Sequence, residues 1–270
     1  MTSSTVRAAA VAGSFYPDHP EVLAAVVEDF LAEAADAPPH APPKAMIVPH
    51  AGYVYSGPVM ARAYARLRDS GAAAGIRRVV LLGPSHYVAL AGLAVPRASA
   101  FATPLGRIPL DGAAIAALAA LPGVSINDAA HRDEHALEVQ LPFLQRLLGA
   151  FEIVPLVAGR AVPALVAGVL DALWGGPETL IVISSDLSHY HDQATARRLD
   201  AATAAAIEAG DLARIGPEQA CGCAGIRGLL AAAPRHALAV ERLGLATSAD
   251  TVGPWQSVVG YGAWALGKSS

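Results

Sequence analysis

Histidines follow three strongly apolar segments of the chain, each time just after a turn built from proline, glycine or serine. The segments read MIV-PHAGY, VVLL-GPSHY and LIVI-SSDLSHYH, and they carry His50, His86 and His189. Clustered imidazoles commonly bind zinc, iron or copper through a neutral ring nitrogen, or transfer protons near pH 7. The pattern therefore indicates metal binding or acid–base chemistry, provided that the three loops meet.

Two further residue types extend this candidate site. Asp186 precedes His189 in the same loop, where a carboxylate can orient an imidazole. The only cysteines, Cys221 and Cys223, are too close in sequence for an ordinary disulfide, which leaves thiol or metal-ligand roles. Cys221 lies nearer the start of a predicted helix, where the dipole favours thiolate. Because helical positions i and i+2 lie roughly 200° apart, only one of the two thiols can face the site. The sequence does not decide between Cys221 and Cys223.

Each feature also has a purely structural interpretation. A single histidine after a strand is more often a loop hydrogen-bonding group than a ligand, and Cys223 suits a small buried apolar position. The segment HRDEH fits a solvated helix start capped by Asp133 as well as it fits a functional His135. The chain contains no GxxxxGK[ST] phosphate loop and no GxSxG nucleophile elbow. Three repeats of the same placement nevertheless favour one shared site over three unrelated loops.

The elements that must position these side chains alternate between buried strands and amphipathic helices. This alternation predicts an α/β fold, three-layered, with a mostly parallel or mixed sheet and helices on both faces. Loops beyond the carboxyl ends of parallel strands form the ligand crevice of such sheets, so the three histidine loops are expected to converge there. Strands are predicted over 44–48, 77–82, 151–157, 179–183, 236–243 and 257–266, a hairpin over 98–110, and helices over 20–35, 58–69, 111–121, 134–148, 163–173, 193–209 and 217–233.

Particular residues define several of these predicted boundaries. Pro58 is expected to open its helix, and Asp133 to cap the helix over 134–148. Asp192 is expected to cap the helix over 193–209, with Gly210 as its end. The proline-rich stretch 37–43 is interpreted as a stiff loop. We see no internal repeat and no linker between two cores, so residues 1–270 are predicted to form one domain.

Composition excludes several classes of protein. Hydrophobic residues make up 54% of the 270 residues and charged residues 16%, which excludes a disordered chain. The longest apolar runs are shorter than the ~18–20 residues of a membrane span, and the N-terminus lacks a secretory pattern. We therefore expect a cytoplasmic protein without a membrane partner. A net charge of −4 with no basic face argues against nucleic acid as a partner.

The chain resembles the Memo-like family, known in many bacteria and archaea as protein B of the AmmeMemoRadiSam system. The matching stretches run in order across nearly the whole chain, and PHAGY, GPSHY and DEHxxExQLP together are highly specific. They are AGSFYP (12–17), PHAGYVYSG (49–57), LLGPSHY (81–87), FATPLGRIPLD (101–111), DEHALEVQLPFL (133–144), SSDLSHY (184–190), ACG (220–222) and VGYGA (259–263).

The resemblance implies a fold like that of class III extradiol dioxygenases and a metal crevice. The implied metal is iron, with copper or zinc as other candidates. The dioxygenase relatives use two histidines and a carboxylate, whereas a thiolate takes the third position here, which sets ring cleavage in question. Cys223 is additional to the family pattern. By matching positions, the ligands would be His50, His86 and Cys221, with Asp186, His189 and His135 beside the metal.

These observations lead to one principal functional hypothesis. The protein would be a mononuclear non-haem iron redox enzyme acting on a small aromatic or peptide substrate. His189, oriented by Asp186, would exchange a substrate proton, and His135 would donate to a developing oxyanion. The alternatives are a phosphopeptide-type binding module that uses the same crevice and a zinc hydrolase. AMMECR-like and radical-SAM proteins are the partners that the resemblance implies.

Overall fold

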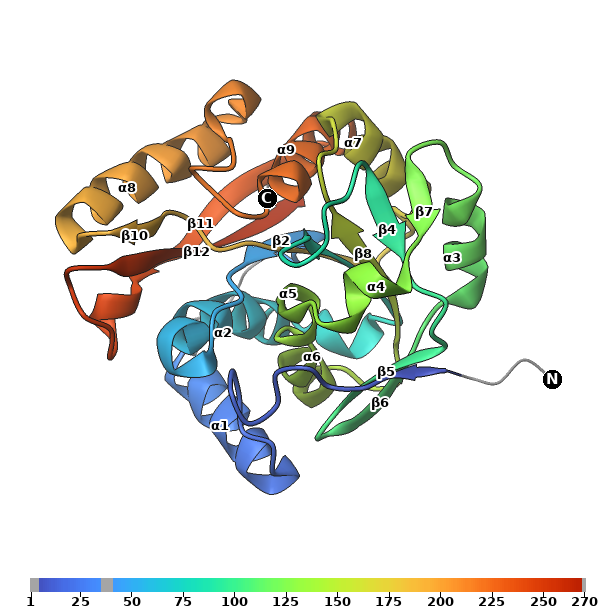
Figure 1. The fold of residues 1–270 in the computed structure, drawn as a ribbon, viewed down its shortest axis with the longest axis horizontal. Helices are drawn as coiled ribbons and strands as arrows, with labels where there is room; N and C mark the ends of the chain where they lie inside the picture. Colours follow the sequence, from blue (N-terminus) through green and yellow to red (C-terminus); the bar gives the residue numbers. More distant parts are fainter. Residues whose placement is uncertain (1–4, 35–40, 269–270) are drawn as a thin grey trace.

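A nine-stranded mixed sheet with helices on both faces forms the body of the protein (Figure 1). The computed structural model describes residues 5–34 and 41–268. The strands are β1 (Val6–Arg7), β2 (Ala45–Val48), β3 (Arg78–Pro84), β4 (Leu93–Val95), β5 (Ala100–Thr103), β6 (Gly106–Pro109), β7 (Val124–Ile126), β8 (Glu152–Ala158), β9 (Thr179–Ser184), β10 (His189–His191), β11 (Leu238–Thr247) and β12 (Val258–Lys268).

The helices alternate with these strands over much of the chain, as the sequence pattern predicted. They are α1 (Pro20–Glu33), α2 (Tyr53–Asp69), α3 (Gly112–Ala119), α4 (Asp128–Arg132), α5 (His135–Glu138), α6 (Leu141–Leu147), α7 (Pro163–Ala172), α8 (Gln193–Ala209) and α9 (Cys223–Ala232).

The centre of the large sheet is parallel. Its strand order is β10-β12-β2-β9-β3-β8-β4-β7, with β11 also paired to β12, and a separate small sheet has the order β1-β5-β6. Strands β2, β9, β3 and β8 run parallel to one another, whereas β12 is antiparallel to β2 and β4 is antiparallel to β8. The prediction of an α/β fold with a mostly parallel or mixed sheet is therefore confirmed.

The helices cover both faces because successive side chains of a strand point to opposite sides. On β3, Leu82 faces α9, where Gly225 leaves room for the leucine side chain. The next residue, Gly83, faces Leu137 and Ala136 of α5 on the other side of the sheet. Figure 1 accordingly shows α7 and α9 on one side of the central strands and α2, α5 and α6 on the other. The prediction of helices on both faces is confirmed.

The central strands are mostly apolar because they are buried on both faces. All four residues of β2 and all six of β9 are buried. β-Branched valine and isoleucine are frequent in these strands, as suits a pleated surface packed between helices. This rigid centre ends at one edge in three neighbouring loops. They follow β2, β9 and β3 and carry His50, Asp186 and His86.

Helix α2 begins earlier than expected. The sequence placed its start at Pro58, but the helix starts at Tyr53 and Pro58 lies inside it. The backbone N–H groups of Tyr55 and Ser56 donate to Gly52 O and close the first turn. Pro58 cannot donate to the carbonyl of Val54, but that residue is 54% exposed, so water can satisfy the carbonyl.

The predicted helix over 134–148 is divided into α5 and α6. Pro142 lacks the N–H that would bond to Glu138 O, which removes one helical hydrogen bond at the junction. Asp133 does not cap this segment, as the sequence had suggested. Glu134 does so instead, since its side chain accepts a hydrogen bond from Ala136 N at 3.0 Å.

Helix α9 begins later than expected, at Cys223 rather than Pro217. The preceding segment turns instead, with Ala220 N donating to Gly216 O. Gly222 then passes so close to the end of β9 that a Cβ atom would lie 2.6 Å from Ser184 O. A helix from Pro217 was therefore the wrong prediction, because the chain must enter this tight contact before it coils.

Other boundaries agree with the sequence. Asp192 accepts a hydrogen bond from Thr195 N and caps α8, and Gly210 ends that helix in the left-handed region with φ 66°. The hairpin expected over 98–110 is formed by β5 and β6. Of the proline-rich stretch 37–43, residues 37–40 lie outside the described part of the chain. In the described ranges, every helix is too short or too polar to cross a bilayer.

Candidate metal centre

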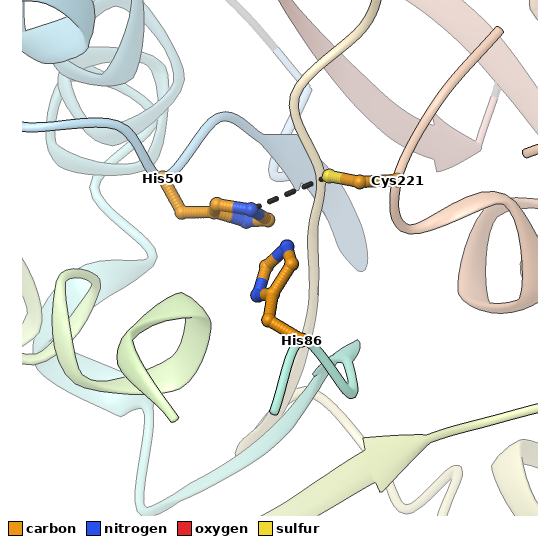
Figure 2. A group of neighbouring side chains, drawn as sticks. All are labelled: His50, His86 and Cys221. Carbon is orange, nitrogen blue, oxygen red and sulfur yellow. Dashed lines mark hydrogen bonds between the residues drawn. The ribbon is translucent and has the colours of Figure 1, made fainter. Parts of the chain in front are cut away.

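His50, His86 and Cys221 lie together at the carboxyl edge of the central strands (Figure 2). One ligand atom from each residue lies within 4.8 Å of the other two. The Nε2 atom of His50 is 3.3 Å from Cys221 Sγ, and the ring centroids of His50 and His86 are 5.2 Å apart. Figure 2 shows both rings and the sulfur pointing toward a common centre. Two loops and the turn before α9 therefore build one site from distant parts of the sequence.

His50 is held from three sides directly after β2. Its backbone N–H donates to Asp186 Oδ1 at 2.7 Å, and its ring Nδ1 lies 2.9 Å from Ser184 Oγ. The side chain is buried, and this burial, with repulsion from His86, lowers the pKa of His50 to about 3. His50 is therefore neutral at physiological pH and can offer Nε2 as a ligand atom.

His86 is fixed by Glu134, a residue to which the sequence reasoning gave no role. The two carboxylate oxygens of Glu134 accept from the backbone N–H of His86 at 2.7 Å and from its Nδ1 at 2.8 Å. Burial opposes the ionised carboxylate, but the bonds to His86 outweigh it and lower the pKa of Glu134 to about 2. A carboxylate on Nδ1 leaves Nε2 of His86 free to face the centre.

Cys221 approaches the site from the turn before α9. Its sulfur accepts a hydrogen bond from Asp186 N at 3.2 Å, and the Cys221 backbone N–H donates to Asp186 O at 3.3 Å. Burial and the nearby Asp186 carboxylate raise the pKa of the Cys221 thiol. The helix dipole was expected to favour the thiolate form of Cys221. Burial of the thiol has the larger effect and favours the protonated form. Cys223, the first residue of α9, packs against the hydrophobic core instead.

His135 stacks beside the centre. Its ring lies 4.6 Å from the ring of His86 with an interplanar angle of 15°, and 5.5 Å from that of His50. The Tyr87 hydroxyl lies 3.2 Å from His135 Nδ1, and Phe15 packs at 4.7 Å. Burial, with repulsion from the other two imidazoles, lowers the pKa of His135 to about 4. His135, His86 and Glu134 also form a second group of ligand atoms within 4.8 Å of one another.

Asp186 lies beside His50 and Cys221 in the loop after β9, and His189 follows it on β10. Asp186 is buried, and this burial raises the pKa of its carboxyl, opposed by the bond from His50 N and by nearby imidazoles. His189 is half-buried on β10, where it pairs with Val259, and it interacts electrostatically with Asp186 and His50. In the described chain, no hydrogen bond joins the Asp186 carboxylate to the His189 ring. The Asp186 carboxylate therefore holds the His50 backbone N–H rather than the His189 ring, which the sequence had led us to expect.

The sequence reasoning missed the residues behind the ligands. Ser184, Glu134 and Gln140 are buried polar residues that support His50 and His86 through hydrogen bonds. Glu134 and Gln140 stand in the stretch DEHALEVQLPFL, which carried the resemblance without a role for either. Polar residues spaced through an otherwise apolar helix were the available signal, because such residues need buried partners.

The donor set fits a single transition-metal ion. Two imidazoles and one sulfur suit zinc, iron or copper better than the oxygen-seeking magnesium or calcium. Each imidazole has its other nitrogen engaged by a neighbouring side chain, as is usual for histidine ligands. Three protein ligands leave further positions open for water or substrate, which is the pattern of reactive rather than purely structural sites.

Comparison with known proteins agrees with this geometry. Residues 7–265 match the family described as Memo-like protein. The chain belongs to the Memo-like family. A MEMO1 family protein of Methanopyrus kandleri, MK0963, is 35% identical, with 95% of this chain and 97% of the relative covered. One from Sulfolobus acidocaldarius is also 35% identical, and MJ0403 of Methanocaldococcus jannaschii is 32% identical, both with the same coverage.

The Memo-like assignment spans every segment that contributes to the centre. His50, His86, His135 and Cys221 all fall inside the matched range, as do the supporting residues of the α5 region. The resemblance drawn from the sequence motifs is therefore confirmed over the full length of the chain. The relatives' names state the family and no reaction, so function must be argued from the site.

Proposed function

We propose that this Memo-like protein is a mononuclear non-haem iron redox enzyme. The observation that carries the proposal is the meeting of His50, His86 and Cys221 within 4.8 Å of one another at the sheet edge. Bound there, iron(II) would supply open coordination positions for substrate and dioxygen. Copper is the other redox metal that this donor set suits.

The surrounding residues would supply proton transfer and orientation. His189 interacts electrostatically with Asp186 and would exchange a proton with the substrate. His135 stands beside His86 and would donate a hydrogen bond to a developing oxyanion. The Asp186 carboxylate accepts a hydrogen bond from the His50 backbone N–H, so it would keep this ligand in place.

The substrate would be a small aromatic or peptide group. Exposed Tyr87 lies against His135 and His86, where an aromatic ring can pack, and Phe15 lies behind His135. We further propose that the protein acts with AMMECR-like and radical-SAM proteins of the AmmeMemoRadiSam system. Their recovery with the tagged chain from its native host, and their loss from a lysate lacking it, would test that association.

The charges at the site disfavour the phosphopeptide-binding alternative. In the described chain, no lysine or arginine makes a hydrogen bond or ring contact with His50, His86 or Cys221. The buried groups there are the carboxyls of Glu134 and Asp186, which repel a phosphate in their ionised forms. Arg132, one of the nearest cations in the sequence, pairs with Asp133 on the surface instead.

Zinc hydrolysis is the second candidate, and one observation favours it. Two histidines and a cysteine with open positions are also a catalytic zinc set, and buried Asp186 stands where a base could act on bound water. Elemental analysis after anaerobic purification distinguishes the two. Iron near one per chain, with a redox-sensitive paramagnetic signal, supports the proposal. Zinc alone supports the hydrolase, and no metal, or unchanged metal in His50→Ala, contradicts both.

A further inference from the structure

A buried hydrogen-bond relay stands behind His50 and ends at its ring. Gln140 is fully buried, and its side-chain amide lies between Tyr64, Pro49 and Ser184. The carbonyl oxygen of Pro49, at 2.8 Å, can only accept a hydrogen bond, so the atom that faces it must be Nε2. Gln140 Oε1 then accepts from the Tyr64 hydroxyl at 2.8 Å. The orientation of the amide follows from its partners alone.

The hydroxyl of Ser184 has three partners and only one hydrogen. Ala136 O, at 2.6 Å, can only accept, so the Ser184 hydroxyl donates to it. Gln140 Nε2, at 2.8 Å, donates its second hydrogen to Ser184 Oγ. The remaining partner is His50 Nδ1 at 2.9 Å. Because the serine hydrogen is already used, Nδ1 must carry the hydrogen of this bond.

We infer that Ser184 and Gln140 are positioning residues that hold His50 in the tautomer protonated at Nδ1, with the Nε2 lone pair directed at the metal position. His50 Nε2 lies 3.3 Å from Cys221 Sγ, while the other ring nitrogen, Nδ1, contacts Ser184. The opposite tautomer would place two acceptor atoms, Nδ1 and Ser184 Oγ, in contact inside the core, where an unpaired polar group is destabilising.

The relay makes the two histidine ligands chemically unequal. His86 donates Nδ1–H to the ionised carboxylate of Glu134, whereas His50 donates to a neutral hydroxyl. A carboxylate partner raises the basicity of the opposite ring nitrogen more than a hydroxyl does. His50 is therefore the weaker electron donor, and its role depends more on fixed orientation. The consequence for metal affinity rests on the proposed function, while the tautomer itself does not.

The tautomer can be measured in metal-free protein. Long-range 1H–15N correlation spectra of histidine-labelled protein distinguish protonated from bare ring nitrogens. The wild type is expected to show His50 with a protonated Nδ1 and a bare Nε2. Ser184→Ala removes the acceptor, so the Nε2–H form, bonded to Cys221 Sγ, should gain population. A wild type with hydrogen on Nε2 would overturn the inference, even if the variant fails to fold.

Zinc affinity gives the second readout, measured by competition with a chromophoric chelator. Ser184→Ala should weaken Zn²⁺ binding about 10–100-fold, as loss of a supporting hydrogen bond does. Ser184→Thr keeps the hydroxyl and should retain most of the wild-type affinity for Zn²⁺. Ser56→Ala is the matched control, because Ser56 is equally buried and its hydroxyl donates to Ala51 O. Unchanged tautomer and affinity in Ser184→Ala would refute the relay. A wild type with the expected tautomer but no metal would uphold the relay and reject the proposed function.

Discussion

Glu134 holds His86 at two points at once, through the backbone N–H at 2.7 Å and through Nδ1 at 2.8 Å. This double contact sets both the path of the loop after β3 and the direction of the imidazole. The same carboxylate caps α5 through Ala136 N. One buried acid thus couples a helix start to the loop that carries His86, a candidate metal ligand, so a change at Glu134 should alter metal binding.

Glu134→Gln should weaken metal binding about 10–100-fold. The two carboxylate oxygens of Glu134 accept three hydrogen bonds, whereas the glutamine side chain has a single acceptor oxygen and cannot accept all three in the same places. Equilibrium competition for Zn²⁺ or anaerobic Fe²⁺ measures the effect. Asp133→Asn is the matched control, since this neighbouring carboxylate is exposed and pairs with Arg132 on the surface. Equal affinities in the two variants would contradict a supporting role for Glu134.

The two cysteines should behave oppositely. Cys221→Ser replaces the sulfur that lies 3.3 Å from His50 Nε2, and it should lower metal affinity by about 100-fold or more. Cys223→Ser changes a side chain that packs against the core and should keep the metal. Metal content per chain and the sulfur-to-metal absorption of a Co²⁺-loaded sample report the difference. Retention of that absorption in Cys221→Ser would place the ligand elsewhere.

Stability depends on a second buried acid. Glu138 is fully buried, forms an ion pair with Arg7, and accepts from the backbone N–H groups of Ala10 at 2.7 Å and Val11 at 3.0 Å. Glu138→Gln leaves the Arg7 charge uncompensated in the core and should lower the free energy of unfolding by about 3–5 kcal/mol. Urea unfolding followed by circular dichroism measures it.

The control for that experiment is an exposed ion pair. Glu28 pairs with Arg146 on the surface, with 56% of its side chain exposed. Glu28→Gln should cost less than about 1 kcal/mol, because solvent screens the pair. A loss in Glu138→Gln as small as that in Glu28→Gln would mean that the N-terminal segment is not held by this carboxylate.

The sequence allowed the loops with the candidate ligands to be found because each loop follows a strongly apolar run that is typical of a buried strand. The apolar runs before His50 and His86 can only be central strands of a covered sheet, and parallel neighbours end at the same edge. The resemblance then selected Cys221, which spacing alone could not separate from Cys223. In the structure, Gly222 passes close to Ser184 O, and this brings Cys221 rather than Cys223 to the site. That contact joins segments far apart in the chain, so the sequence could not reveal it.

The supporting residues could not be predicted for a related reason. Asp133 and Glu134 are adjacent acids, and either can cap a helix by its chemistry. Which of them turns inward depends on where the loop after β3 lies, since the buried one bonds to His86. Likewise, α2 can start before Pro58 because Val54, whose carbonyl lacks the proline N–H as a partner, is an exposed residue, and the sequence does not reveal that exposure. Long-range burial, rather than local propensity, settles these positions.

His131 makes the stability of the metal-free protein depend on pH. The side chain is buried, its Nε2 lies 3.0 Å from Ala94 O, and burial lowers its pKa from 6.5 to about 4. Above pH 6.5 the ring is neutral in both the folded and the unfolded chain. Between pH 6.5 and 4 the unfolded chain binds a proton that the folded chain refuses, so the free energy of unfolding falls by up to about 1.4 kcal/mol per pH unit.

Urea unfolding of the metal-free protein at pH 7.5, 6.5 and 5 should therefore show decreasing stability, and His131→Gln should reduce the slope. The slope that remains belongs to His50 and His135, whose pKa values burial also lowers. His19→Gln is the control, because His19 is exposed at the start of α1 and should leave the slope unchanged. If His131→Gln keeps the full wild-type slope, the pKa of His131 is the same in the folded and the unfolded chain, and burial of this ring does not make the stability depend on pH.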